Sequence, residues 1–169
     1  MKLFAIYVGG GHPRANIEIH DIRFVAGEDL EATFPVLKQE WWGTPGSLHV
    51  DAYADLTRLP GWQVNVQDTP PPDGGARLFF VNVGYYVAGR FGELHDYQFR
   101  VCDSEKTAWR EAKAALGRQE GMHKDNLIGV DDIIDVSAEI EAGGRYLALT
   151  PDTGTAGGPE PVSCYIRLA

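Results

Sequence analysis

Cysteine is scarce in this chain. The 169 residues include only Cys102 and Cys164, and the two do not form a CxxC motif. This usage is typical of a protein of the reducing cytoplasm, and we expect both thiols to be reduced. A single disulfide between them stays open as the alternative.

Long apolar runs and clustered positive charge are also missing. The apolar run at residues 3–8 ends in three glycines and is too short for a signal-peptide core or a membrane span. The formal net charge is −9, and Lys and Arg are scattered singly. We therefore expect no membrane association and no nucleic-acid binding, because phosphate contacts need clustered basic side chains.

What the chain does contain is an internal repeat with an offset of 75 residues. Eight of the 24 positions from residue 3 to 26 are identical in the second copy, where unrelated segments would share roughly one or two. His49-Val-Asp51 also resembles His123-Lys-Asp125, with a slip of one residue. The repeat predicts two units of similar structure. The residues identical in the second copy are Leu3, Phe4, Val8, Gly9, Glu18, His20, Asp21 and Phe24.

Hydrophobic patterning predicts two strands, a helix and two more strands in each unit. In the first unit the strands are expected at residues 3–8, 17–26, 48–56 and 62–66, with the helix at 28–41. Pro35 should delay the regular helix or kink it. In the second unit residues 146–149 take the role of 62–66.

The expected fold class is α+β, with two tandem ββαββ repeats related by a pseudo-two-fold axis. The strand and helix order is similar to that of a β-grasp roll. We expect a first repeat at 1–66, a Pro/Gly linker at 67–76 and a second repeat at 77–150. Residues 151–169 should form a Gly/Pro loop and an extra C-terminal strand that seals a sheet edge.

The alternation of the second strand shifts by one residue at His20-Asp21, and again at His95-Asp96. A β-bulge produces such a shift, and it would turn both side chains of each pair toward the same side. His49 and Asp51 are expected to share one face of the third strand.

These polar residues define one candidate cluster in each repeat. Imidazoles with carboxylates suit Zn, Mn or non-haem Fe. The spacing matches no established metal motif, however, and His beside Asp at a bulge also satisfies freed backbone groups. The sequence favours a structural role over a metal or polar-ligand site, and it assigns no metal and no cofactor. The clusters are Glu18, His20, Asp21, His49 and Asp51, and Glu93, His95, Asp96, His123 and Asp125.

Trp42 is a further candidate, as a contact residue. Trp41 is in phase with the apolar face of the predicted helix, whereas Trp42 is out of phase and should be exposed. Glycines 9–11 lead into a strand instead of a helix, which argues against a phosphate-binding loop.

With its LFAIYVGG, EIHDIRFV and HVD segments and their second copies, the chain resembles a bacterial family of unknown function. It is the domain-of-unknown-function family numbered 1543, whose domain occurs in one or two copies. The resemblance covers nearly the whole chain, least clearly residues 150–169. It implies no activity, substrate or cofactor.

The function favoured by the sequence is a non-enzymatic binding or protein-interaction module. Its partner, a protein or a small molecule, and its oligomeric state are not given by the residues. The alternative is a small metal-dependent enzyme that uses the His/Asp cluster of one or both repeats. An acidic inhibitor of a basic partner is a third hypothesis, which rests on charge alone.

Overall fold

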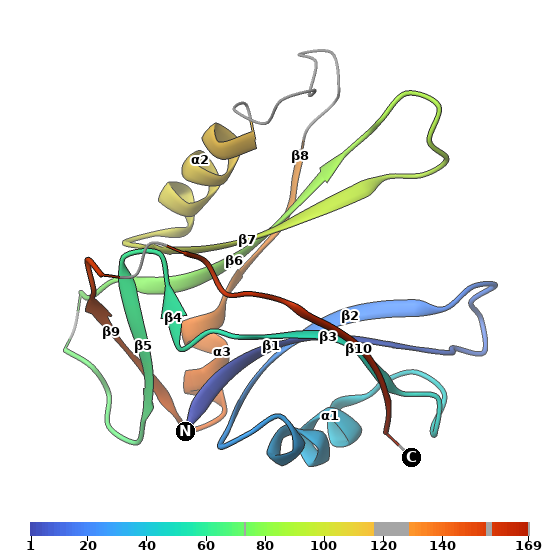
Figure 1. The fold of residues 1–169 in the computed structure, drawn as a ribbon, viewed down its shortest axis with the longest axis horizontal. Coiled ribbons are helices and arrows are strands. Elements are labelled where there is room, and N and C mark those ends of the chain that lie inside the picture. The colour runs from blue at the N-terminus through green and yellow to red at the C-terminus, as the bar shows by residue number, and fades with distance from the viewer. Residues whose placement is uncertain (73, 117–128, 155–156, 169) are drawn as a thin grey trace. The chain divides into compact units, whose positions relative to one another are not determined.

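The computed structural model of the protein describes residues 1–72, 74–116, 129–154 and 157–168 (Figure 1). The fold is α+β with mostly antiparallel sheets, as the sequence predicts. It divides into two compact units, residues 1–70 with 142–169, and residues 71–141. Among the described residues, no helix is long and apolar enough to cross a membrane.

The first unit is built on a four-stranded antiparallel sheet in the order β10-β3-β1-β2. Its strands are β1 (Lys2–Gly10), β2 (Ile19–Gly27), β3 (His49–Asp55) and β10 (Val162–Arg167). One face is covered by helix α1 (Phe34–Glu40), which follows a 3-10 turn, η1 (Glu31–Thr33). Pro35 lies in the first turn of α1, so the late helix start is confirmed.

An apolar core joins α1 to this sheet. The even-numbered residues of β1 point toward the helix, so Tyr7 and Gly9 point to the opposite face. That opposite face carries the candidate site. The buried core residues are Phe4, Ile6, Val8, Val25, Leu30, Leu37, Leu48, Val50 and Leu168.

A second, three-stranded sheet in the first unit has the order β4-β5-β9. It contains β4 (Arg58–Leu59), β5 (Trp62–Gln67) and β9 (Tyr146–Pro151). β9 comes from the second repeat, yet it pairs along its whole length with β5. The compact units therefore differ from the predicted boundaries 1–66 and 77–150, because hydrogen bonds between strands join segments far apart in sequence.

The second unit contains the antiparallel sheet β7-β6-β8. The strands are β6 (Arg77–Tyr85), β7 (Leu94–Cys102) and β8 (Gly129–Asp135). Helix α2 (Glu105–Leu116) packs on this sheet through Ala108 and Ala112. Helix α3 (Val136–Ala142), which the sequence patterning does not predict, follows β8 directly.

The predicted bulges at His20-Asp21 and His95-Asp96 are wrong. β1 and β2 pair in unbroken register, and so do β6 and β7. The apparent phase shift arises because β2 has apolar residues on both faces, as the adjacent buried residues Phe24 and Val25 show, so its alternation does not mark a single buried face.

The bulge lies on the third strand of each sheet instead. Tyr7 faces Ala52 and Val8 faces Val50, so Asp51 is an extra residue on β3 and breaks the predicted two-residue alternation there. On β8 the same irregularity leaves Asp131 as the extra residue. The bulge is therefore a feature of both repeats.

An ion pair repeats along with the bulge. Lys2 Nζ lies 2.7 Å from Asp55 Oδ2, and Arg77 Nε lies 2.6 Å from Asp135 Oδ2. The hydrogen bond to Asp55 raises the pKa of Lys2. Asp55 and Asp135 each lie four residues after the bulged aspartate, which shows that β8 matches β3 position for position.

The C-terminal strand seals the β3 edge of the first sheet, as predicted. Beyond it, the Leu168 backbone N–H donates to Leu48 O at 2.9 Å, and the Leu168 side chain is buried in the core.

Leu168→Ala should therefore lower the free energy of unfolding by about 2–5 kcal/mol, as for other buried leucines. The neighbouring control Arg167→Ala removes an exposed side chain and should change the value by no more than about 0.5 kcal/mol. Urea denaturation followed by circular dichroism measures both. Equal stability of the two variants would mean that the C-terminal strand does not belong to the folded core.

Candidate functional site

Gly9 lies at the centre of the first cluster. It is the Cα partner of His20 on β2 and of His49 on β3, so the two histidines flank it on either side. A Cβ atom on Gly9 would lie 2.7 Å from both His49 Nε2 and Asp51 Oδ2, closer than real Cβ atoms come to such atoms. The glycine thus leaves open the space in which the flanking side chains meet.

Four side chains surround this space, with carboxylates and imidazoles in alternation. His49 Nε2 lies 3.0 Å from Glu18 Oε1 and 3.4 Å from Asp51 Oδ1. His20 Nε2 lies 3.5 Å from Asp51 Oδ2 and 3.7 Å from Glu18 Oε2. Each carboxylate therefore offers one oxygen to each imidazole. We call Glu18, His20, His49 and Asp51 the first-repeat cluster.

Hydrogen bonds do not satisfy the deepest atoms of this cluster. Within the described residues, His49 Nε2 and Asp51 Oδ2 are buried and make no hydrogen bond. Carboxylate and imidazole neighbours lie within ion-pair distance, but their directions do not fit a hydrogen bond. Buried polar atoms are nearly always hydrogen-bonded. Two exceptions directed at one space are typical of a site for a bound group.

The ring orientation of His49 is set by the backbone. Its Nδ1–H donates to the carbonyl oxygen of Ser47 at 3.1 Å, because a carbonyl oxygen only accepts. In the neutral form of the ring, this tautomer carries the lone pair on Nε2, the atom that faces the carboxylates. A hydrogen bond from the far ring nitrogen to a carbonyl is the usual support of a metal-ligating histidine.

Aromatic rings cover the two imidazoles. The Tyr7 ring stacks on His20 with centroids 5.2 Å apart and an interplanar angle of 7°. The Tyr165 ring, from β10, lies 4.6 Å from the His49 ring. These contacts hold the imidazole planes in place without using their nitrogen atoms.

Cys164 precedes Tyr165 but is not part of the cluster. It packs against the core on the helix side, and its thiol donates to Val50 O at 3.6 Å. Burial raises the pKa of this thiol, and the charge of Asp51 adds to the effect. The thiol is therefore kept in its protonated form, which is a poor metal ligand. Both cysteines are free thiols.

Asp21 and Asp96 also lie outside the clusters, contrary to the sequence prediction. Because β2 and β7 have no bulge, adjacent residues point to opposite faces, and both aspartates lie on the helix side. Asp21 Oδ2 pairs with Arg23 Nη2 at 2.7 Å and accepts a hydrogen bond from Trp42 Nε1 at 3.3 Å. Trp42 is 52% exposed, which confirms its predicted exposure.

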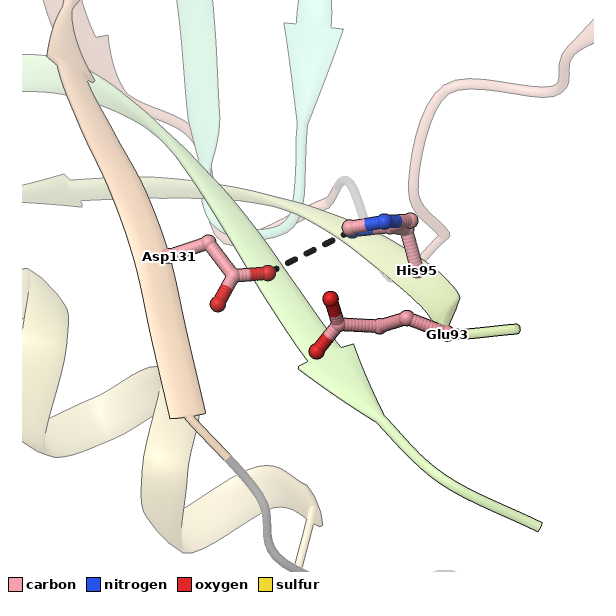
Figure 2. A group of neighbouring side chains, drawn as sticks. All are labelled: Glu93, His95 and Asp131. Carbon is pink, nitrogen blue, oxygen red and sulfur yellow. Dashed lines mark ion pairs between the residues drawn. The ribbon is translucent and has the colours of Figure 1, made fainter.

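The second unit repeats three members of the cluster. Glu93, His95 and Asp131 each offer one ligand atom, and these atoms all lie within 4.8 Å of one another. Figure 2 shows their side chains pointing toward one another across β6. Gly84 takes the place of Gly9, and a Cβ atom there would collide with the carboxylates of Glu93 and Asp131. We call Glu93, His95 and Asp131 the second-repeat cluster.

The surroundings of the second-repeat cluster differ from those of the first. His95 Nδ1 lies 3.0 Å from Asn82 Oδ1 and 3.4 Å from Asp131 Oδ2. The charge of Glu93 raises the pKa of the Tyr86 phenol, together with partial burial, a hydrogen bond to Glu93 and the charge of Asp131. The Tyr86 hydroxyl therefore lies beside this cluster.

The match of His49-Val-Asp51 to His123-Lys-Asp125 is wrong in register. Gly9 pairs with His49 on β3, and the equivalent Gly84 pairs with Gly129 on β8. The counterparts of His49 and Asp51 are therefore Gly129 and Asp131, while His123 and Asp125 lie outside the described residues. A Val-Asp-x-x-x-Asp pattern at 50–55 and 130–135 carries the correct match in the sequence.

Comparison with known proteins agrees with the repeat. Residues 15–66 and 90–140 each match the family described as Domain of Unknown Function (DUF1543). The crystal structure of a protein Il1583 from Idiomarina loihiensis is similar, with a TM-score of 0.70 and 33% identity over 99% of this chain and 98% of that one. No curated protein matches. The two matched segments span more than half of the chain, which therefore belongs to the DUF1543 family and carries its domain twice.

Proposed function

We propose that the protein is a binding module that holds a divalent metal ion in the first-repeat cluster, with a related site in the second repeat. The observation that supports this is the buried Nε2 of His49, which faces two carboxylates and makes no hydrogen bond to any residue that the structure describes. A cation between these groups would take up the His49 lone pair and satisfy Asp51 Oδ2 as well. The module favoured by the sequence would thus have a metal ion as its ligand.

Each nitrogen–oxygen contact within the cluster has the length expected for two ligands of one ion. Donor atoms placed tetrahedrally about 2.1 Å from zinc lie about 3.4 Å apart. The four nitrogen–oxygen distances in the first-repeat cluster run from 3.0 to 3.7 Å, with Glu18 and Asp51 each turning one oxygen to His49 and the other to His20. Two neutral imidazoles and two carboxylates also form a donor set whose charge a divalent cation balances.

The competing structural role needs a different proton arrangement. A network that only stabilises the fold would have imidazole N–H groups donating to the carboxylates. At His49 the Nδ1–H is donated to Ser47 O, and Nε2 has no hydrogen-bond geometry toward Glu18 or Asp51. The contacts of His49 thus support a metal ligand over a purely structural residue.

The duplication extends this proposal to the second repeat. Glu93, His95 and Asp131 occupy the positions of Glu18, His20 and Asp51, again beside a glycine of the central strand. We further propose that the duplicated element is a ββαββ unit in which β9 is the counterpart of β5. The pseudo-two-fold axis stays a prediction.

A metal-dependent enzyme is the second candidate function. It is favoured by the exposure of the whole second-repeat cluster, because three ligands, the number found among the described residues, and access to solvent leave a coordination position for water. Zinc- or manganese-loaded protein should be assayed on an activated ester and an activated phosphodiester. Turnover that disappears in His95→Ala would favour the enzyme. Equal rates with and without metal would favour the binding module.

Zinc should raise the melting temperature of the metal-free protein. An ion present at 100 times its Kd adds about 2.7 kcal/mol to the stability of the folded state. Scanning calorimetry with and without zinc measures the shift. His20→Ala should lose the part of the zinc-induced rise in melting temperature that the first repeat contributes. His12→Ala removes an imidazole outside both clusters and should keep the full rise.

If the clusters only stabilise the fold, the same experiment should give the opposite pattern. His20→Ala would then lower the stability of the metal-free protein by about 1–3 kcal/mol, because partners of the imidazole are stranded. The wild-type protein would show no response to zinc. That combination would refute the proposed function.

Gly9→Ala should close the first site while the fold is kept. Its methyl group would enter the space between His49 Nε2 and Asp51 Oδ2, and the ends of these side chains must move apart. Isothermal titration calorimetry should show the loss of zinc binding in the first repeat. The control is Gly75→Ala, whose Cβ would make only an ordinary contact, 3.6 Å from Pro72 O. Undiminished binding by Gly9→Ala would place the ion elsewhere.

A further inference from the structure

The two clusters differ at one position with a direct chemical consequence. The strand register puts His49 beside Gly9 in the first repeat and Gly129 beside Gly84 in the second. The first-repeat cluster therefore has two imidazoles and two carboxylates. Within the part of the chain that the structure describes, the second-repeat cluster has one imidazole and two carboxylates. Four protein ligands complete a tetrahedral site, whereas three leave it open.

The kind of ion follows from this difference. Imidazole nitrogen favours borderline ions such as Zn²⁺, Co²⁺ and Ni²⁺, whereas carboxylate oxygen alone suits Mg²⁺, Ca²⁺ and Mn²⁺. With a second imidazole, the first-repeat cluster should discriminate more strongly in favour of zinc-class ions. Its buried histidine adds to this preference, because the side chain of His49 is 4% exposed and that of His95 is 37% exposed.

The first-repeat cluster also has a cover that comes from the C-terminal strand. Ser163 pairs with Ala52 and Ile166 with Val50, so two residues of β10 face the single position of Asp51. Such an irregularity re-aims side chains. It leaves Tyr165 with its ring on His49. Among the described residues of the second unit, no strand pairs with the outer edge of β8, and Asp131 has no such cover.

We infer that the two repeats are unequal metal sites, the first a tight site for a zinc-class ion retained beneath Tyr165, the second a weaker and exchanging site. This inference rests on the proposed function. It assigns His49 the role of the fourth ligand and Tyr165 the role of a retaining side chain that does not itself bind the ion.

The affinity test uses the full chain, stripped of metal and titrated with Co²⁺, whose visible absorption reports tetrahedral coordination, and then with Zn²⁺. Two classes of site should appear, with affinities that differ at least about tenfold. His49→Gly, which gives the first repeat the residue of the second, should weaken the tight class on the order of 100-fold and abolish its tetrahedral spectrum. His95→Ala should remove the weak class only.

His20→Ala is the control for a folding defect in His49→Gly. His20 belongs to the same site, but it is more exposed than the buried His49. It too should weaken the tight class, with an unchanged circular dichroism spectrum. A titration with Mg²⁺ should not displace Co²⁺ from the tight class.

Retention is tested by the rate at which a chelator removes the ion. Tyr165→Ala should release the tight ion roughly tenfold faster than the wild-type protein, whereas Tyr165→Phe should keep the slow rate because it keeps the ring. Equal rates in all three proteins would refute the retaining role of Tyr165.

The remaining outcomes separate this inference from the proposed function. Two sites of equal affinity, or a tight class that survives both His49→Gly and His20→Ala, would overturn the inequality while leaving metal binding intact. A wild-type protein that binds neither Co²⁺ nor Zn²⁺ would overturn the proposed function and the inference with it.

Discussion

The architecture of both clusters depends on a glycine in the central strand. Residues on β2 and β3 are separated by β1, and paired positions on neighbouring strands lie about 5 Å apart. Side chains from the outer strands could not meet over an ordinary residue, because its Cβ would occupy the space between them. At Gly9 this atom is absent, and His49 and Asp51 from one side approach His20 and Glu18 from the other. Gly84 provides the same opening in the second unit.

This arrangement buries polar atoms, which lowers the stability of the folded state. A buried imidazole nitrogen without a hydrogen bond destabilises the folded state by about 1–3 kcal/mol, and among the described residues His49 Nε2 is such an atom. The backbone of Ser47, the ring of Tyr165 and the neighbouring carboxylates all position His49 without supplying that hydrogen bond. A buried, oriented and unsatisfied nitrogen is better explained by a ligand than by the stability of the fold. The second repeat, where glycine replaces this histidine, avoids the cost.

Much of the first cluster could be predicted from the sequence. The repeat identifies Gly9, Glu18 and His20 together with Gly84, Glu93 and His95, because strand pairs with a short connection keep a constant offset. Alternation at 162–168 also predicts the C-terminal strand and its place at a sheet edge. The sequence places the bulge on the wrong strand, because β2 has apolar residues on both faces and its alternation does not mark one buried face. Asp131 was missed because the insertion before β8 shifts the offset from 75 to 80 residues.

The sequence by itself determined the duplication, the α+β class, most elements of each unit and the residue types of the two clusters, since these follow from identity and local periodicity. Only the tertiary structure decided that β2 and β3 both flank β1, that Asp51 and Asp131 are the bulged residues, and that β9 pairs with β5. The physical reason is that strand order and register are set by hydrogen bonds between segments distant in sequence. A shift of one residue, invisible in the composition, moves a side chain to the other face of the sheet and decides whether Asp21 or Asp51 joins the histidines.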